Sequence, residues 1–247
     1  MNQEHTLILN LIFILLGGFF SLLEVLFPER SINYKKEFHL DFLAFLLLSF
    51  CGIFISNPLI NYYRSLHLGE SLFFLQNLNP VVKVFLATLL TDFLNYGIHY
   101  FMHSNQYFWK THIHHHRIKE LYWFSGLRAS FGHYLAFIFS RITVGVLLFN
   151  LNSLELLYYL TFGLITNFFQ HTNARISSKW IEYILVTPRL HRRHHSIDGK
   201  RLKNIATIFS FWDRLFNTFE GPENFTKDYP FGVKTDKKTF FSEFIGF

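Results

Sequence analysis

Five apolar runs, each roughly 20 residues long, constrain this chain more than any other feature of its sequence. They cover residues 6–27, 40–56, 81–101, 134–149 and 152–170. A helix rises ~1.5 Å per residue, so a run of this length crosses a hydrocarbon core that is ~30 Å thick. One such run is compatible with a buried helix of a soluble protein, but five of them in 247 residues predict a membrane protein. We therefore expect an all-α integral membrane protein with about four to five transmembrane helices.

Nothing in the sequence divides the chain into separate parts. Residues 1–247 contain no repeat, low-complexity tract or Gly/Ser linker, so we expect a single membrane domain with a polar C-terminal part. The last two apolar runs are separated only by 150–151, which predicts a tight helical hairpin. Across that hairpin we expect Arg141 to pair with Glu155 or to extend to the interface. No Lys or Arg precedes the first run and no small-residue cleavage site follows it, which predicts a retained anchor.

The distribution of basic residues predicts how the chain lies in the membrane. Lys and Arg number three in 28–39, one in 57–80, four in 102–133 and 13 from Arg175 onward. If the N-terminus lies outside, five spans place every Lys/Arg-rich segment on one side, which should be the cytoplasm. The net charge of +6 then belongs to a face near anionic headgroups. Because no basic segment is separable from the spans, nucleic acid is not an expected partner.

Histidine is the second unusual feature, because eleven of the 14 histidines lie between His99 and His195. His99 and His103 stand four residues apart at the end of the third run, and a lone His171 ends the fifth. Two H-x-x-H-H clusters complete the set, namely His112, His115 and His116, and His191, His194 and His195. Residues spaced three or four apart share a helix face, so each cluster can direct two or three imidazoles to one point. Nine imidazoles near the membrane surface are enough for two metal ions.

The histidines also limit the kind of metal site. Imidazole suits iron, zinc, copper and nickel. The single Cys excludes a disulfide framework and a Cys-based zinc or iron–sulfur site, and a haem would need only one or two axial histidines. The set therefore favours a catalytic metal pair. Two alternatives stay open: a His-rich metal transporter, although its ligands should then lie at mid-membrane, and a membrane protein that binds metal without catalysis.

The ordered histidine boxes resemble the membrane fatty acid hydroxylase/sterol desaturase superfamily, in particular bacterial sterol-desaturase-like proteins and the alkylglycerol monooxygenase type. The stretches that carry the resemblance are HYFMH (99–103), FWKTHIHHH (108–116), FQHTN (169–173), TPRLHRRHHS (187–196) and FWDRLFNTF (211–219). The resemblance covers roughly 85–220. It implies a cytoplasmic helical cap over a histidine-ligated di-iron centre. The ligands it implies are His99, His103, His112, His115, His116, His171, His191, His194 and His195.

The resemblance also implies a reaction, which is the O₂-dependent hydroxylation or desaturation of an unactivated C–H bond in a fatty acyl, sterol or ether lipid. The histidines act in it as ligands and not as general bases, since metal-bound imidazole is neutral and has given up its lone pair. Zinc can replace iron in such a site in purified protein. The chain has no G-x-G-x-x-G and no Cys cluster, so a ferredoxin, cytochrome or reductase must supply electrons. We expect this donor to dock near Lys200, Arg201 and Lys203, and contact of these cations with lipid headgroups is the alternative.

Two polar residues are predicted to support the ligands. Asp92, Tyr96, His99 and His103 lie on one helical stripe, so the Asp92 carboxylate is placed to accept the second N–H of a ligand histidine. The alternative is a membrane-buried acid that pairs with some other group. Asn173 follows the lone histidine by two residues, and we expect it to fill a coordination gap, to hold a water or to cap the helix.

We expect neither His114 nor His133 to bind metal, and His133 fits no box. His114 lies within the second box but faces away from its three neighbours. The compact length, and the lack of an ER-retrieval tail after Phe247, favour a bacterial inner membrane over the endoplasmic reticulum.

Overall fold

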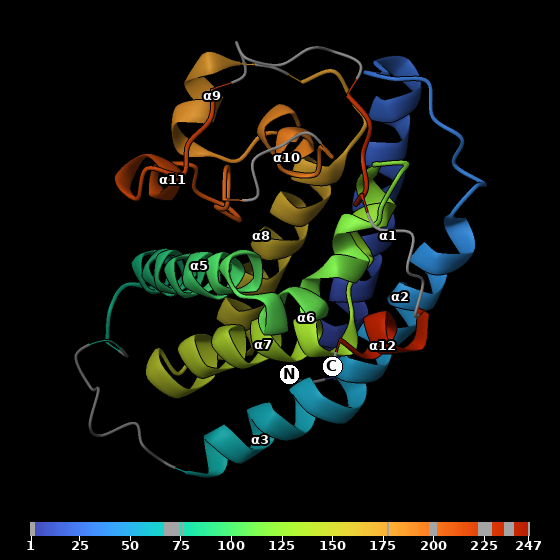
Figure 1. The fold of residues 1–247 in the computed structure, drawn as a ribbon. Coiled ribbons are helices and arrows are strands. Elements are labelled where there is room, and N and C mark those ends of the chain that lie inside the picture. The colour runs from blue at the N-terminus through green and yellow to red at the C-terminus, as the bar shows by residue number, and fades with distance from the viewer. Residues whose placement is uncertain are drawn as a thin grey trace.

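The computed structural model describes residues 3–66, 75, 77–176, 178–197, 202–221, 229–234 and 240–246. This part of the chain is almost entirely helical, with three isolated β-bridges and no strand. Figure 1 shows α1 and α8 rising side by side toward the end of the molecule that carries α10, while α5 and α7 run across them. The expected all-α fold is confirmed.

Four helices among the described residues are long and apolar enough to cross a membrane. The first is Glu4–Leu26 within α1 (Gln3–Leu26), and the third is α5 (Pro80–Ser104). The second, Phe38–Ser65, runs without a break through α2 (Phe38–Cys51), the π-helical turn η1 (Gly52–Ser56) and α3 (Asn57–Ser65). The fourth, Phe131–Leu148, comprises α7 (Phe131–Ile142) and the π-helical η4 (Thr143–Leu148). The chain is therefore an integral membrane protein, as predicted.

The fifth apolar run forms α8 (Ser153–His171), which lies inside the bundle and is not among the four candidate spans. The predicted hairpin is present, and Asn150 adopts a left-handed φ of 44° in its short link. Asn152 then caps α8 by accepting the N–H of Glu155, whose side chain accepts the N–H of Asn152 in return. The helix packs against α1, α5 and α10 and ends at the histidine-rich centre. This helix thus connects the membrane part to the site.

A buried ion pair fixes the start of α8, although its partners differ from those expected. Glu155 Oε2 lies 2.7 Å from Lys83 Nζ, and the two side chains are only 5% and 8% exposed. Arg141 instead approaches Gly163, in the middle of α8. The prediction of an Arg141–Glu155 pair is therefore wrong. The cation beside the first turn of α8 is Lys83 of α5 and not Arg141 of α7.

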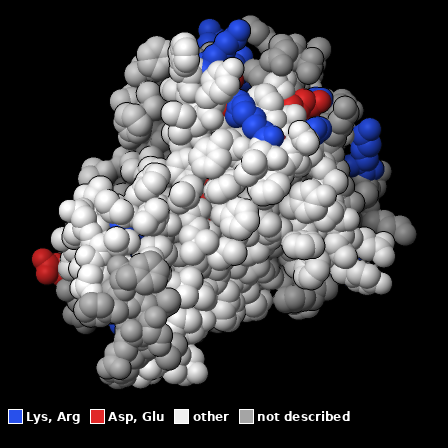
Figure 2. Space-filling view, turned by 90° about the vertical axis from the view of Figure 1, so that its left-hand side faces the viewer, with Lys and Arg blue, Asp and Glu red and all other residues white. Residues whose placement is uncertain are grey.

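Short helices cover the end of the molecule that lies beyond the histidines of α5 and α8. They are α9 (Lys179–Ile184), α10 (Pro188–His194) and α11 (Phe211–Leu215) (Figure 1). The other short elements are α6 (Gln106–His116), the 3₁₀ turn η3 (Trp123–Leu127) and α12 (Phe240–Ile245), of which α12 packs against α6 and α7. Asn105 starts α6 and Thr187 starts α10, each with a side-chain cap on the first turn. Figure 2 shows Lys and Arg gathered at this end, above a broad surface with few charges. That distribution agrees with a polar cap on an apolar, membrane-embedded body.

Candidate metal centre

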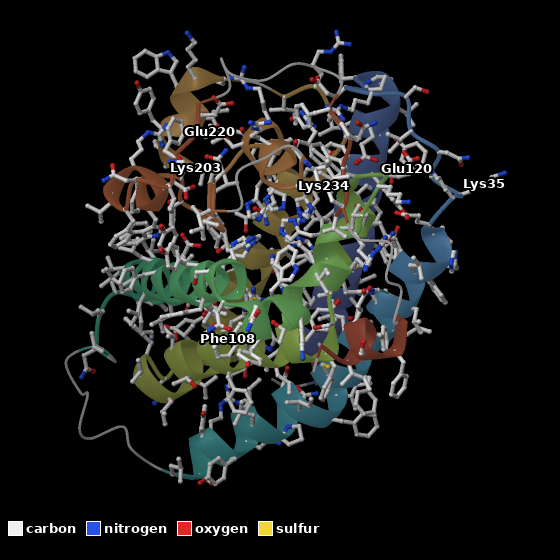
Figure 3. The ribbon with its side chains drawn as sticks, in the orientation of Figure 1. Lys35, Phe108, Glu120, Lys203, Glu220 and Lys234 are labelled. Carbon is white, nitrogen blue, oxygen red and sulfur yellow. The ribbon has the colours of Figure 1, made fainter. Side chains whose placement is uncertain are left out.

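The structure brings all nine predicted ligand histidines together, in two groups. The group we call the five-histidine centre contains His99, His103, His112, His116 and His194. The group we call the four-histidine centre contains His115, His171, His191 and His195. Within each group every residue is buried, and one nitrogen of each imidazole lies within 4.8 Å of all the others. Figure 3 shows this nitrogen-rich region in the middle of the molecule, enclosed by α5, α6, α8 and α10.

Each H-x-x-H-H box divides its histidines between the two centres. On α6, His112 and His116 stand four residues apart and face the five-histidine centre, whereas His115 faces the other one. The second box does the reverse, since its outer pair joins the four-histidine centre and its middle residue joins the five-histidine centre. The imidazoles of His116 and His195 consequently stack at the boundary, with ring centroids 4.5 Å apart. The two centres are therefore immediate neighbours.

Backbone carbonyls determine which ring nitrogen faces the centre in two imidazoles of the five-histidine centre. His99 Nδ1 lies 2.5 Å from the carbonyl oxygen of Ile205, and His194 Nδ1 lies 3.0 Å from that of Lys203. A neutral imidazole has one N–H, so donation from Nδ1 leaves the lone pair on Nε2. Nε2 of His194 is buried and has no hydrogen-bond partner among the described residues. A buried lone pair without a donor is costly, and a bound metal ion would satisfy it.

The four-histidine centre is oriented in the same way. His115 Nδ1 lies 2.7 Å from the carbonyl oxygen of Arg128, and His171 Nδ1 lies 2.8 Å from that of Asn167. Both Nε2 atoms then carry lone pairs, and they face each other at 3.4 Å. Two lone pairs at this distance repel unless a positive ion lies between them. The donor set of this centre therefore also fits a metal ion.

Burial keeps these imidazoles in the form that binds metal. Burial, followed by the proximity of other imidazoles, lowers the pKa well below 6.5 for His112, His115, His116, His191 and His195. The neutral form is the one that coordinates metal ions. The two groups contain only histidine, a set that suits iron, zinc, copper or nickel rather than magnesium or calcium.

Arg128 links the four-histidine centre to the start of the second span. Its Nε donates to Asp41 at 2.7 Å, its Nη1 donates to Glu37 at 3.0 Å, and its carbonyl oxygen accepts from His115. Arg128 and Asp41 are fully buried, and Tyr122 donates a further hydrogen bond to the same carboxylate. This ion pair fixes the backbone that orients a predicted ligand. The sequence offered no periodic signal for it, because its partners lie about 90 residues apart.

Asp92 supports the site differently from the prediction. Its buried carboxylate accepts hydrogen bonds from Thr207 Oγ1 at 2.6 Å, Phe209 N at 2.9 Å and Trp212 Nε1 at 3.0 Å. His99, two helical turns further along α5, donates instead to Ile205. The prediction of a direct hydrogen bond between Asp92 and a ligand histidine is thus wrong. The segment 205–212 packs against α5 and forms hydrogen bonds with both the Asp92 carboxylate and the His99 imidazole. Asp92 holds the segment that orients His99.

Asn173 is also engaged away from the histidines. Its Nδ2 donates to the carbonyl oxygen of Arg30 at 2.8 Å, and its Oδ1 accepts the N–H of Arg30 at 3.3 Å. Thr172, and not Asn173, caps α8. The predicted roles of Asn173 as a ligand, water site or cap are therefore wrong, because the oxygen and the nitrogen of its side-chain amide both bind Arg30, in the segment that follows α1.

The two histidines that we did not expect to bind metal have different surroundings. His133 Nδ1 lies 2.9 Å from Nδ1 of His112, and the two rings stack with centroids 4.9 Å apart. His133 thus contacts a predicted ligand from α7, a role that its position outside every box did not indicate. His114 lies outside both centres, as expected, and its ring contacts Phe244 of α12.

An all-α membrane bundle that buries two adjacent histidine groups has the ligand set of a metal-binding membrane protein. The family model described as "Fatty acid hydroxylase" matches residues 84–218, which include all nine histidines and more than half of the chain. The chain belongs to the fatty acid hydroxylase family, which confirms the resemblance seen in the sequence.

Several curated proteins are similar to the chain. "Ornithine lipid hydroxylase OlsE" of Rhizobium tropici is 28% identical over 144 residues, which are 57% of this chain and 42% of that protein. "Alkylglycerol monooxygenase" of Homo sapiens is 31% identical over 135 residues, which are 54% of this chain and 30% of that protein. The same enzyme of Caenorhabditis elegans is 28% identical over 159 residues, 63% of this chain and 30% of that protein. The matches thus span less than half the length of these relatives. No solved structure matches the chain.

Proposed function

We propose that this protein is a di-iron oxidoreductase that hydroxylates an unactivated C–H bond of a membrane lipid with O₂. The observation that carries the proposal is the sorting of nine buried histidines into two adjacent centres inside the family region. The nine histidines are the proposed ligands, and one membrane domain over 1–247 is the proposed unit. Zinc in a purified sample would be a replacement for iron.

The chain's own residues prepare these centres for metal and oxygen chemistry. When iron is bound, it supplies the reduction of O₂ and the oxidising power that a C–H bond requires. The imidazoles stay neutral because they are buried, and four backbone carbonyls hold four of the rings in a fixed orientation. The enclosing helices exclude water from the reacting groups.

The names of the relatives support a lipid as the substrate. One relative is named for an ornithine lipid and another for alkylglycerols, and both names denote the insertion of oxygen. The four candidate spans would place a lipid chain beside the centres without removing it from the bilayer. We therefore favour hydroxylation, with desaturation of a fatty acyl, sterol or ether lipid as the second outcome of the test.

Electrons must come from an external ferredoxin, cytochrome or reductase in this proposal. We place the cap and the centres on the cytoplasmic side, in a bacterial inner membrane, where such donors are available. Of the residues expected at the docking face, Lys200 and Arg201 lie outside the described residues. Lys203 donates from Nζ to the carbonyl oxygen of Asn217 at 2.9 Å, so its ammonium group supports the cap.

Lipid mass spectrometry combined with isotopically labelled O₂ tests the proposal. Cells that express the protein should contain a lipid with one labelled oxygen atom, and cells that express His194→Ala should not. His114→Ala is the matched control, since this histidine is buried on the same cap but outside both centres. Purified protein should contain two metal ions. Clearly fewer than two, together with product formation that survives in His194→Ala, would refute the proposal. Metal flux into vesicles without lipid oxidation would favour the alternative, a His-rich metal-binding or transport protein.

A further inference from the structure

One peptide group connects a buried carboxylate to a predicted metal ligand. The carbonyl oxygen of Ile205 lies 2.5 Å from Nδ1 of His99. The same peptide plane carries the N–H of Ala206 on its opposite side, and this N–H points at Asp213, 3.2 Å from each carboxylate oxygen. Asp213, the peptide and His99 therefore form a continuous hydrogen-bonded chain.

The carboxylate at the end of this chain is held tightly. Asp213 is 1% exposed, and the two residues of the peptide are fully buried. Its Oδ1 also accepts the N–H of Ile205 at 2.7 Å and the hydroxyl of Thr218 at 2.7 Å. Burial raises the pKa of Asp213 to about 6, so the group is mostly ionised at neutral pH and above. A negative charge thus sits on the N–H side of the peptide whose carbonyl faces the histidine.

A carboxylate in this position changes what the carbonyl can do. It polarises the peptide, which makes the carbonyl oxygen a stronger acceptor, because hydrogen bonds in a chain strengthen one another. A stronger acceptor at Nδ1–H holds the imidazole in one orientation and makes its Nε2 a more basic ligand. We propose that Asp213 is a positioning residue that acts through the Ile205–Ala206 peptide on His99 and strengthens metal binding at the five-histidine centre. This inference rests on the proposed function insofar as the nine histidines bind metal.

The same segment orients a second ligand of the same centre. The carbonyl oxygen of Lys203 accepts from His194 Nδ1 at 3.0 Å. Between the two carbonyls stands Asn204, whose φ of 53° turns the backbone, and its Oδ1 accepts the N–H of Glu220 at 2.9 Å. Figure 3 shows Lys203 and Glu220 close together beside α10 and α11. Residues 203–206, which we call the strap, therefore serve two of the five histidines.

The four-histidine centre does not use the strap. Its carbonyl acceptors are those of Arg128 and Asn167. A carboxylate that contacts its chain segment is Glu24 at the end of α1, which accepts from Thr172 Oγ1 and from Asn173 N, both at 2.9 Å, just after His171. Loss of the Asp213 charge should therefore weaken one centre and spare the other.

Cobalt titration of the metal-free, full-length protein in lipid nanodiscs tests the proposal. The titration is done at about pH 8, where Asp and Glu carboxyl groups are normally ionised. Wild-type protein should bind two Co²⁺ ions. Asp213→Asn should bind one ion with unchanged affinity and the other roughly 10–100-fold more weakly, which is the usual cost of losing an outer partner of a ligand. The visible Co²⁺ spectrum identifies the weakened centre, because it depends on the number and geometry of the ligands.

Glu24→Gln is the matched control, since it should weaken ion binding at the four-histidine centre and change the spectral component of that centre. The intact centre in each variant reports that the protein has folded. If Asp213→Asn loses both ions, Asp213→Glu decides, because it keeps the charge and should retain both. Unchanged binding in Asp213→Asn, or loss in Asp213→Glu equal to that in Asp213→Asn, would overturn the role of the charge. Wild-type protein that binds fewer than two ions would instead refute the proposed function.

Discussion

His116 of α6 and His195 at the end of α10 stack on each other with ring planes only 19° apart, although they belong to different centres. Neither ring can turn without moving the other, because both are buried among the remaining histidines. The boundary between the centres is thus a packed contact between two proposed ligands, and we expect this contact to couple the two sites mechanically.

A change at this boundary should affect both metal ions. We expect His116→Ala to remove the ion of the five-histidine centre, to weaken the second ion, and to lower activity by more than about 100-fold, beyond the loss typical of outer-shell changes. Metal analysis and lipid oxidation measure the two effects. His114→Ala, two positions earlier on the same helix, should retain both ions. Full occupancy of the four-histidine centre in His116→Ala would contradict the mechanical coupling.

The Arg128–Asp41 pair should contribute strongly to stability. Asp41→Asn leaves a buried guanidinium with only its Glu37 partner, and removing one member of a buried pair costs about 3–5 kcal/mol. Thermal unfolding in detergent measures the loss. As a comparison, Glu120→Gln breaks a pair with Lys36, which is 53% exposed, and should cost under about 1 kcal/mol. Equal effects of the two substitutions would show that burial of the first pair does not matter.

The Lys83–Glu155 pair allows a compensation experiment. Lys83→Met leaves a buried carboxylate without its cation and should destabilise the protein by about 3–5 kcal/mol. Adding Glu155→Gln removes the stranded charge, so the double variant should recover most of that loss. Unfolding of the two single variants and the double variant provides the comparison. A double variant that is as unstable as the sum of the two single variants would rule out the pairing.

Acid should destabilise the metal-free protein from about pH 6.5 downward. The pKa values of His112, His115, His116, His191 and His195 are lowered by burial, so these groups stay neutral in the folded chain while the unfolded chain takes up protons. The free energy of unfolding should then be level above pH 6.5 and fall below it. Unfolding curves at a series of pH values measure this. A stability that stays constant between about pH 6.5 and 5 would disagree with buried neutral imidazoles.

Local spacing made the clustering of the histidines predictable. Residues such as His99 and His103 share a helix face whatever the rest of the chain does, and the four candidate spans follow from hydropathy alone. Spacing also places His115 on a different face of α6 from His112 and His116, but it does not predict which centre each of these two faces lines. That division depends on how α6 and α10 are packed, which no local pattern contains.

Long-range partners were not predictable for the same reason. Asp92 bonds to groups about 115 residues later in the chain, and Glu24 bonds to groups about 149 residues later. A buried acid in a span predicts that some partner exists, but its identity is decided by tertiary packing. His133 could have been suspected only as a histidine in the first turn of a helix beside the others, a signal too weak to assign a contact.

The strap and α10 also set the order in which the site is assembled. All four candidate spans end by Leu148, whereas both centres need histidines from 191–195, and two of those in the five-histidine centre need carbonyls from 203 and 205. A chain emerging from the ribosome therefore presents its spans to the membrane while neither centre is complete. Each group of histidines therefore becomes complete only when the segment 191–206 has folded against the spans.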